Sequence, residues 1–209
     1  MRTLIKHIFI FASITLITSA CSTMNKNECL NADWRTIGYS DGARGYKATR
    51  IGQHSSACAE YGVRPDLNAY NSGRDEGLVQ FCTSTTGYSK GLHGYSYNGV
   101  CARHNEGAFL EAYNYGLTIY KAKQRLQTLK TKYADEEKYI NKLERRLQKK
   151  EDILISGKLT KVKALTLLNE TKEMAEELGV AKSNLYRLDK KIHKQIQRIS
   201  YLKGQSRYR

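Results

Sequence analysis

The feature that most constrains the fold is a pair of apolar stripes in the C-terminal part of the chain. In each stripe, apolar residues recur at alternating steps of three and four, and Ser156-Gly157 separates the two stripes. Such steps align residues along one face of an α-helix. The first stripe contains Leu126, Leu129, Tyr133, Glu136, Ile140, Leu143, Leu147, Lys150 and Leu154, where Glu136 and Lys150 are polar interruptions. The second contains Ala164, Leu167, Thr171, Met174, Leu178, Ala181, Leu185, Leu188, Ile192, Gln195, Ile199 and Leu202.

Neither stripe can remain exposed to water, and the short break between them brings them together. We therefore expect an antiparallel coiled-coil hairpin over residues 117–209, with its turn near residues 156–159. Each arm of roughly 40 residues would extend about 60 Å. Gly179 costs the second helix roughly 1 kcal/mol relative to alanine. The alternative is pairing of stripes between chains, which a concentration-dependent mass would reveal.

Composition divides the chain near residue 117. Residues 21–116 contain nine Lys/Arg and nine Asp/Glu, whereas residues 117–209 contain 24 Lys/Arg and 11 Asp/Glu. The first part also holds 13 of the 16 glycines and nine of the 15 tyrosines. The sequence therefore predicts an all-α protein with a compact, neutral, Gly/Tyr-rich head of short helices and a basic helical hairpin.

The N-terminus has the order of features found in a secretory signal peptide. Residues 1–7 carry Arg2 and Lys6 but no acid, and residues 8–17 are apolar. Small residues then precede Cys21. This apolar run is shorter than the roughly 20 residues that span a membrane. Residues 1–20 are therefore predicted to be a signal peptide, with a short buried helix as the alternative.

The site before Cys21 resembles a bacterial lipobox, although Thr18 stands where Leu is usual. The resemblance implies that Cys21 is acylated, for example with palmitate, and cleaved to become the new N-terminus. Several acyl chains would anchor the protein stably. Ser22 in place of Asp favours the outer membrane over the inner one. We expect an outer-membrane lipoprotein, on the periplasmic face.

Four further cysteines remain after Cys21. An even number in an exported chain indicates two disulfides, for which three pairings exist. Sequential pairing, Cys29–Cys58 and Cys82–Cys101, closes the shortest loops and is the prediction. A zinc site is the alternative, but the chain has no CxxC spacing.

Glycines of the head recur at helical spacing. Steps of four and three place them on one helix face, where they would let another backbone approach closely. The glycines concerned are Gly38, Gly42 and Gly45, Gly73 and Gly77, and Gly87, Gly91 and Gly94. Residues 67–73 also resemble residues 110–116, so both segments are predicted to be helical, with Asp66 as an N-cap. The alternative is that these glycines mark turns.

A linked order of motifs resembles a family of small Gram-negative lipoproteins that is known only as a domain of unknown function. The motifs are CLNADWRTIGYSDGARG from Cys29, IGQH from Ile51, Cys58, GVRPDL from Gly62, YNSGRDEGLVQFC from Tyr70, and GVC ending at Cys101. The resemblance covers roughly residues 29–120. It implies an envelope lipoprotein with no established activity, and it supplies no catalytic residues.

The sequence contains no motif of a known catalytic or cofactor site, such as GxSxG, HExxH or a phosphate-binding loop. We therefore predict no catalytic residues, no metal and no cofactor. The alternative is an envelope hydrolase in the head, with His54 as base and nearby aspartates. Asp33 and Trp34 have a structural interpretation, as an N-cap and a buried anchor.

The basic tail suggests a binding surface. Residues 182–209 contain nine Lys/Arg and one acid, Asp189. The predicted basic face comprises Lys182, Arg187, Lys190, Lys191, Lys194, Arg198 and Lys203. It would contact an envelope protein, peptidoglycan or lipopolysaccharide, rather than nucleic acid, which an exported lipoprotein rarely meets. The alternative is a solvated helical face. The sequence thus favours a structural or binding lipoprotein over an enzyme.

Overall fold

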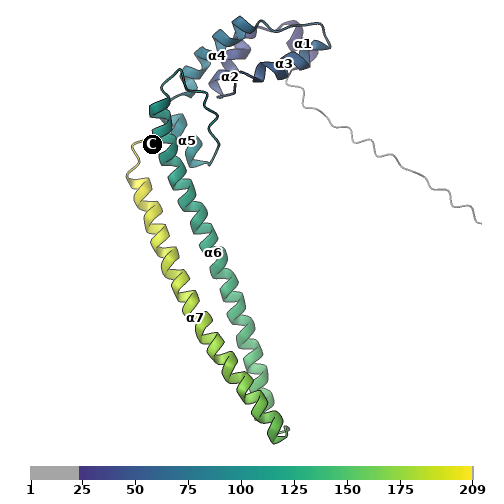
Figure 1. Ribbon diagram of the computed structural model, residues 1–209, viewed down its shortest axis with the longest axis vertical. Helices are drawn as coiled ribbons and strands as arrows, with labels where there is room; N and C mark the ends of the chain where they lie inside the picture. Colours follow the sequence, from purple (N-terminus) through teal and green to yellow (C-terminus); the bar gives the residue numbers. More distant parts are fainter. Residues whose placement is uncertain (1–23, 209) are drawn as a thin grey trace, which may run out of the picture.

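The computed structural model describes residues 24–208, and within them every regular element is an α-helix. The helices are α1 (Lys26–Leu30), α2 (Trp34–Ala43), α3 (Arg50–Ala59), α4 (Leu67–Phe81), α5 (Ser84–Leu92), α6 (Glu106–Ile155) and α7 (Lys161–Gly204). The short helices form a head at one end, and α6 and α7 form a long hairpin (Figure 1). The all-α prediction is confirmed. The predicted signal peptide and Cys21 lie outside the described residues.

The head consists of two helix pairs packed through glycine, α2 with α4 and α5 with α6. A Cβ at Gly38 would overlap the carbonyl oxygen of Tyr70, and one at Gly73 would overlap that of Arg35. Contacts advance in the same direction along both helices, so the helices of each pair run parallel. Glycines spaced by four let the backbones approach this closely. The predicted close approach is confirmed, and residues 84–92 are helix rather than turn.

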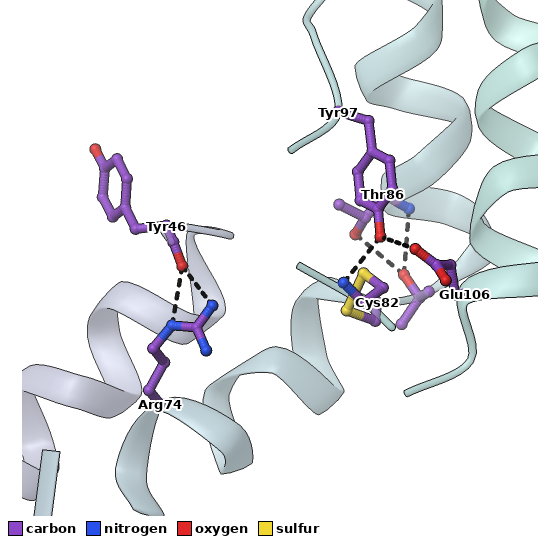
Figure 2. Close-up of a disulfide and its surroundings, with 8 residues drawn as sticks. Tyr46, Arg74, Cys82, Thr86, Tyr97 and Glu106 are labelled. Carbon is purple, nitrogen blue, oxygen red and sulfur yellow. Dashed lines mark hydrogen bonds between the residues drawn. A yellow bond between two sulfur atoms is a disulfide. The ribbon is translucent and has the colours of Figure 1, made fainter. Parts of the chain in front are cut away.

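The two pairs are structural repeats of each other. Equivalent positions are Gly38 and Gly87, Gly42 and Gly91, Gly77 and Gly116, Tyr70 and Phe109, and Arg74 and Tyr113. Arg74 donates through Nε and Nη2 to the carbonyl oxygen of Tyr46 (Figure 2), and the Tyr113 hydroxyl donates to that of Tyr95. The sequence similarity between residues 67–73 and 110–116 is therefore one helical turn out of structural register.

Gly45 plays a different role from the one predicted. It does not lie on the packed face of α2, because the helix ends at Ala43 and Gly45 follows its C-cap with φ of 76°. Gly94 ends α5 in the same way, with φ of 73°. Glycine adopts this left-handed conformation without steric cost. Aromatic rings, of Phe81 and Tyr120 respectively, cover the two glycines.

A disulfide fixes the connection between the two helices of each repeat, which we call the crossover. Cys29 pairs with Cys58 and Cys82 pairs with Cys101, and each bond ties the segment before the first helix to the connection leading to the second. Cys58 and Cys101 are fully buried. These bonds leave none of the four thiolates for a zinc site. In the second crossover, Tyr97 accepts from the Cys101 amide and donates to Glu106 (Figure 2); burial and that carboxylate raise the pKa of Tyr97 to about 12.

The hairpin follows the predicted stripes closely. Every residue of both stripes is buried or half-buried, and Ile140, Leu143, Met174, Ala181 and Ile199 are among the buried ones. The turn falls between Ile155 and Lys161, where Thr160 caps α7 through Lys163 N. α6 continues from the head into the hairpin without a break. Within residues 24–208, no helix is both long and apolar enough to cross a membrane.

Candidate functional site

The charge of the hairpin is confined to the half next to the head. Residues 117–134 contain five Lys/Arg and no acid, and residues 182–209 contain nine Lys/Arg and one acid. Residues 135–181, which form the distal half, contain ten Lys/Arg and ten Asp/Glu. Antiparallel pairing places the two basic segments side by side, so the proximal half of the hairpin holds the entire net charge of the tail (Figure 1).

In the distal half, the rows flanking the apolar seam complement each other. The Tyr139 hydroxyl donates to Glu177, and Lys150 forms an ion pair with Glu170. On the other side of the seam, Glu144 Oε1 lies 2.8 Å from Nζ of Lys182, the first residue of the basic segment. Opposite charges or hydrogen-bonding partners across a coiled-coil seam are the usual arrangement.

The proximal half breaks this arrangement. Two heptads closer to the head, the positions equivalent to Tyr139 and Glu177 are occupied by Arg125 and Lys191. Both side chains are exposed, and neither forms an ion pair within the described residues. One heptad from Arg125, Lys132 extends the same row. In the same register the position opposite Lys132 is Asn184, so the like charges that face each other are Arg125 and Lys191. Their approach costs electrostatic free energy when no anion lies between them.

On α7, five of the predicted basic residues form one stripe. Their spacing of three, four and seven places them on a single side of the helix, and all are exposed. The stripe comprises Arg187, Lys190, Lys191, Lys194 and Arg198. Lys182 differs, because it is paired with Glu144, and Lys203 lies off the stripe. We use the term proximal basic face for this stripe together with Arg125 and Lys132. The contribution of α6 was missed because it depends on the antiparallel register.

The end of α7 is fixed to the head, so the proximal basic face has a defined position relative to it. The Tyr115 hydroxyl donates to the Leu202 carbonyl at 2.7 Å, and Arg207 pairs with Glu111. The Tyr208 ring packs against Tyr88, with ring centroids 5.8 Å apart. Within the seam, Gln195 Nε2 donates to the Ala122 carbonyl at 2.9 Å. The head is thus docked against the base of the hairpin.

The first repeat contains a buried polar network. Asp41 Oδ2 lies 2.8 Å from His54 Nε2 and accepts a 2.8 Å hydrogen bond from the Tyr70 hydroxyl. All three side chains are buried. Burial and the hydrogen bond to Asp41 raise the pKa of Tyr70. The sequence singled out His54 with nearby aspartates, and the structure identifies Asp41 as the aspartate in contact, because α3 packs against the α2–α4 pair.

Asp41 and His54 also line an open cavity of about 450 Å³, together with Ser40, Arg44 and Arg50. The other polar residues considered from the sequence lie elsewhere. Asp33 and Asp66 cap α2 and α4, as predicted for both, and hydrogen bonds from Thr36 lower the pKa of Asp33. His93 Nδ1 lies 2.8 Å from the Ser89 carbonyl oxygen at the end of α5. Trp34 is buried in the core around the Cys29–Cys58 bond.

A comparison with protein families finds a similarity that covers most of the head. Residues 33–118 match the model of a family described as "Protein of unknown function (DUF2799)". Comparisons with curated proteins and with solved structures find no match. The matched segment starts at the N-cap of α2 and ends two residues into the hairpin, so it contains both glycine-packed pairs. Residues 33–118 are therefore similar to a family whose function is unknown, in agreement with the resemblance that the motifs of the head indicated.

Proposed function

We propose that this protein is a lipid-anchored binding protein of the bacterial cell envelope, and that the proximal basic face of its hairpin binds an extended anionic polymer. The observation that carries the proposal is that Arg125 and Lys191 face each other beside the exposed basic stripe of α7. An isolated hairpin gains nothing from facing cations, whereas a polyanion lying along the seam would neutralise both of them.

The shape of the face favours a polymer over a small ion. The stripe from Arg187 to Arg198 rises about 16 Å along α7 at 1.5 Å per residue. Its side chains are exposed along this whole length. Peptidoglycan with free carboxylates and lipopolysaccharide with phosphates share the required chemistry.

The lipid anchor supplies the second half of the proposal. Acylation of Cys21 would hold the N-terminus at the outer membrane, and Met24, three residues later, is buried against the Cys29–Cys58 core. The head would then stay close to the membrane while the hairpin extends from it. An exported protein of this kind meets envelope polymers rather than nucleic acid.

The test is co-sedimentation of the chain without its predicted signal peptide, carrying Cys21→Ser. The probes are purified peptidoglycan and lipopolysaccharide, each at low and high salt. The key variant combines Arg125→Gln, Lys132→Gln, Lys191→Gln and Lys194→Gln. The matched control removes four distal charges with Lys138→Gln, Lys142→Gln, Lys149→Gln and Lys172→Gln.

We expect salt-sensitive retention on at least one probe that weakens at least about tenfold in the proximal variant, because each cation near an anionic surface contributes about 1 kcal/mol. The distal control should bind like the original chain. The probe that retains the protein identifies the polymer. Equal binding by both variants, or no retention on either probe at low salt, would contradict the proposal.

A second candidate function is that of an envelope hydrolase. The observation that favours it is the contact between His54 and Asp41 beside a cavity. Under this hypothesis, His54 acts as base and Asp41 orients it. Replacement His54→Ala would abolish turnover of a peptidoglycan or ester substrate and spare polymer binding. Turnover equal to that of the original chain would reject the hydrolase hypothesis.

A further inference from the structure

The distal tip of the hairpin exposes a cluster of large aliphatic side chains. They lie at the end of α6 and in the first turns of α7, on both sides of the turn. Their exposed fractions are 48% for Ile153, 82% for Ile155, 74% for Val162, 63% for Leu165 and 54% for Leu168. Five large aliphatic side chains exposed between residues 153 and 168 exceed the scattered single apolar residues that are normal on a protein surface, and such a concentration indicates an interaction site.

These residues are not part of the seam that holds the hairpin together. Leu165 and Leu168 directly follow the seam residues Ala164 and Leu167, so they point about 100° away around the helix. The seam is already filled at this level by Leu154, which is half-buried. The hairpin therefore cannot cover the exposed cluster by closing more tightly.

The charge at the tip has one sign. Residues 153–169 contain three lysines, Lys158, Lys161 and Lys163, and no acid. All three are exposed and form no ion pair within the described residues. Elsewhere in the distal half, ten acids outnumber seven Lys/Arg, so within that half the acid-free segment is local to the tip.

We infer that the tip of the hairpin, around Ile155, Val162 and Leu165, inserts into the interfacial region of a lipid bilayer that carries anionic headgroups. Aliphatic side chains flanked by lysine are the composition of interfacial membrane segments, where burial of apolar area and attraction to anionic lipid act together. The lysine stems add apolar contact while their ammonium groups reach phosphate. The helix turn presents these groups at a convex end, which fits a flat bilayer without a preformed pocket.

This membrane contact is separate from polymer binding by the proximal basic face, which lies at the other end of the hairpin. A protein with an acylated N-terminus and an inserting tip would contact lipid at both ends of a long rigid arm. The inference concerns only the tip, so it does not depend on whether Cys21 is acylated.

The first test is flotation of the Cys21→Ser chain with vesicles of phosphatidylethanolamine and phosphatidylglycerol, compared with vesicles of phosphatidylcholine alone. The tip variant combines Ile155→Ser, Val162→Ser and Leu165→Ser. The matched control removes three exposed apolar residues outside the tip, with Val180→Ser, Tyr186→Ser and Ile196→Ser. We expect the tip variant to bind the anionic vesicles at least about tenfold more weakly than the control.

The second test measures insertion directly. Trp34 is the only tryptophan and is buried, so a tip tryptophan introduced as Ile155→Trp reports against a constant background. Insertion shifts its emission to the blue on anionic vesicles, and brominated lipids quench it. An unchanged spectrum on vesicles that bind the protein would overturn the inference.

Two further outcomes would also overturn it. Flotation that the tip variant retains, but that the four-charge proximal variant loses, would assign membrane binding to the proximal basic face. A mass that rises with concentration in the absence of vesicles, and that the tip variant abolishes, would identify the occupant as a second copy of the chain. Failure of polymer binding with normal tip insertion would reject the proposed function and leave this inference intact.

Discussion

Helix α6 packs in two different ways along its length, and the contrast explains much of this molecule. Near its start it lies against α5 through glycine, with Gly116 against the backbone of Tyr88 and Gly91 against that of Tyr113. Farther along it pairs with α7 through side chains such as Ile140 and Leu143. One helix therefore joins a backbone-to-backbone contact to a coiled-coil seam.

The two modes differ in what they tolerate. A glycine contact has no room for even one methyl group, because the nearest atom is usually backbone and cannot move independently. A seam is built from side chains, which can be exchanged for others of similar size at modest cost. The head is thus fixed in shape, and the hairpin is free to vary in surface charge as long as the seam persists.

The largest effect should come from Gly42→Val in the head. The added Cβ would overlap the Arg74 carbonyl oxygen, so α2 and α4 must separate. We expect a loss of at least about 4 kcal/mol in the free energy of unfolding, or failure to fold. Urea unfolding followed by circular dichroism measures it. The control is Gly52→Ala in α3, where a Cβ would meet nothing within 4 Å, and a comparable loss there would refute the packing argument.

A smaller effect is expected from Leu143→Ala in the seam. Leu143 is 1% exposed, and truncation of a buried leucine costs about 2–5 kcal/mol. The loss should appear in the hairpin alone, because Leu143 lies outside the head. Trp34 fluorescence, which reports on the head, should therefore stay unchanged while the hairpin unfolds. Val180→Ala, at a residue that is 61% exposed, should change stability by no more than about 0.5 kcal/mol. Simultaneous unfolding of head and hairpin would show that the two modes do not act independently.

Sequence reasoning succeeded where one helix or one local rule decides the outcome. The seam residues follow from periodicity, and Asp33 and Asp66 cap helices because an acid precedes each. It was incomplete where two elements meet. The similarity of residues 67–73 to 110–116 suggested an alignment of the two repeats that is one helical turn away from the structural one. Identical residues in two segments need not make equivalent contacts.

The candidate site illustrates the same limit. Five of the seven basic residues predicted on α7 share one stripe, since helical spacing alone places them. The cations Arg125 and Lys132 of α6 are brought beside this stripe only by the antiparallel pairing that the Tyr139–Glu177 contact defines. Whether a charge is balanced depends on its neighbour across the seam, and a single helix does not contain that information.

The smallest effect on stability should come from Gly179→Ala. We expect a gain here, whereas substitution of a glycine in a head contact should cause a loss. Gly179 lies on the exposed side of α7, and a Cβ there would meet nothing within 4 Å. Alanine restricts the unfolded chain and favours helix, so we expect a gain of about 0.5–1 kcal/mol in hairpin stability by thermal denaturation. Glycine is thus required where backbones touch in the head and is dispensable in the hairpin. A destabilised Gly179→Ala chain would mean that this face of α7 is covered, for instance by a second hairpin, and would require the monomeric arrangement to be revised.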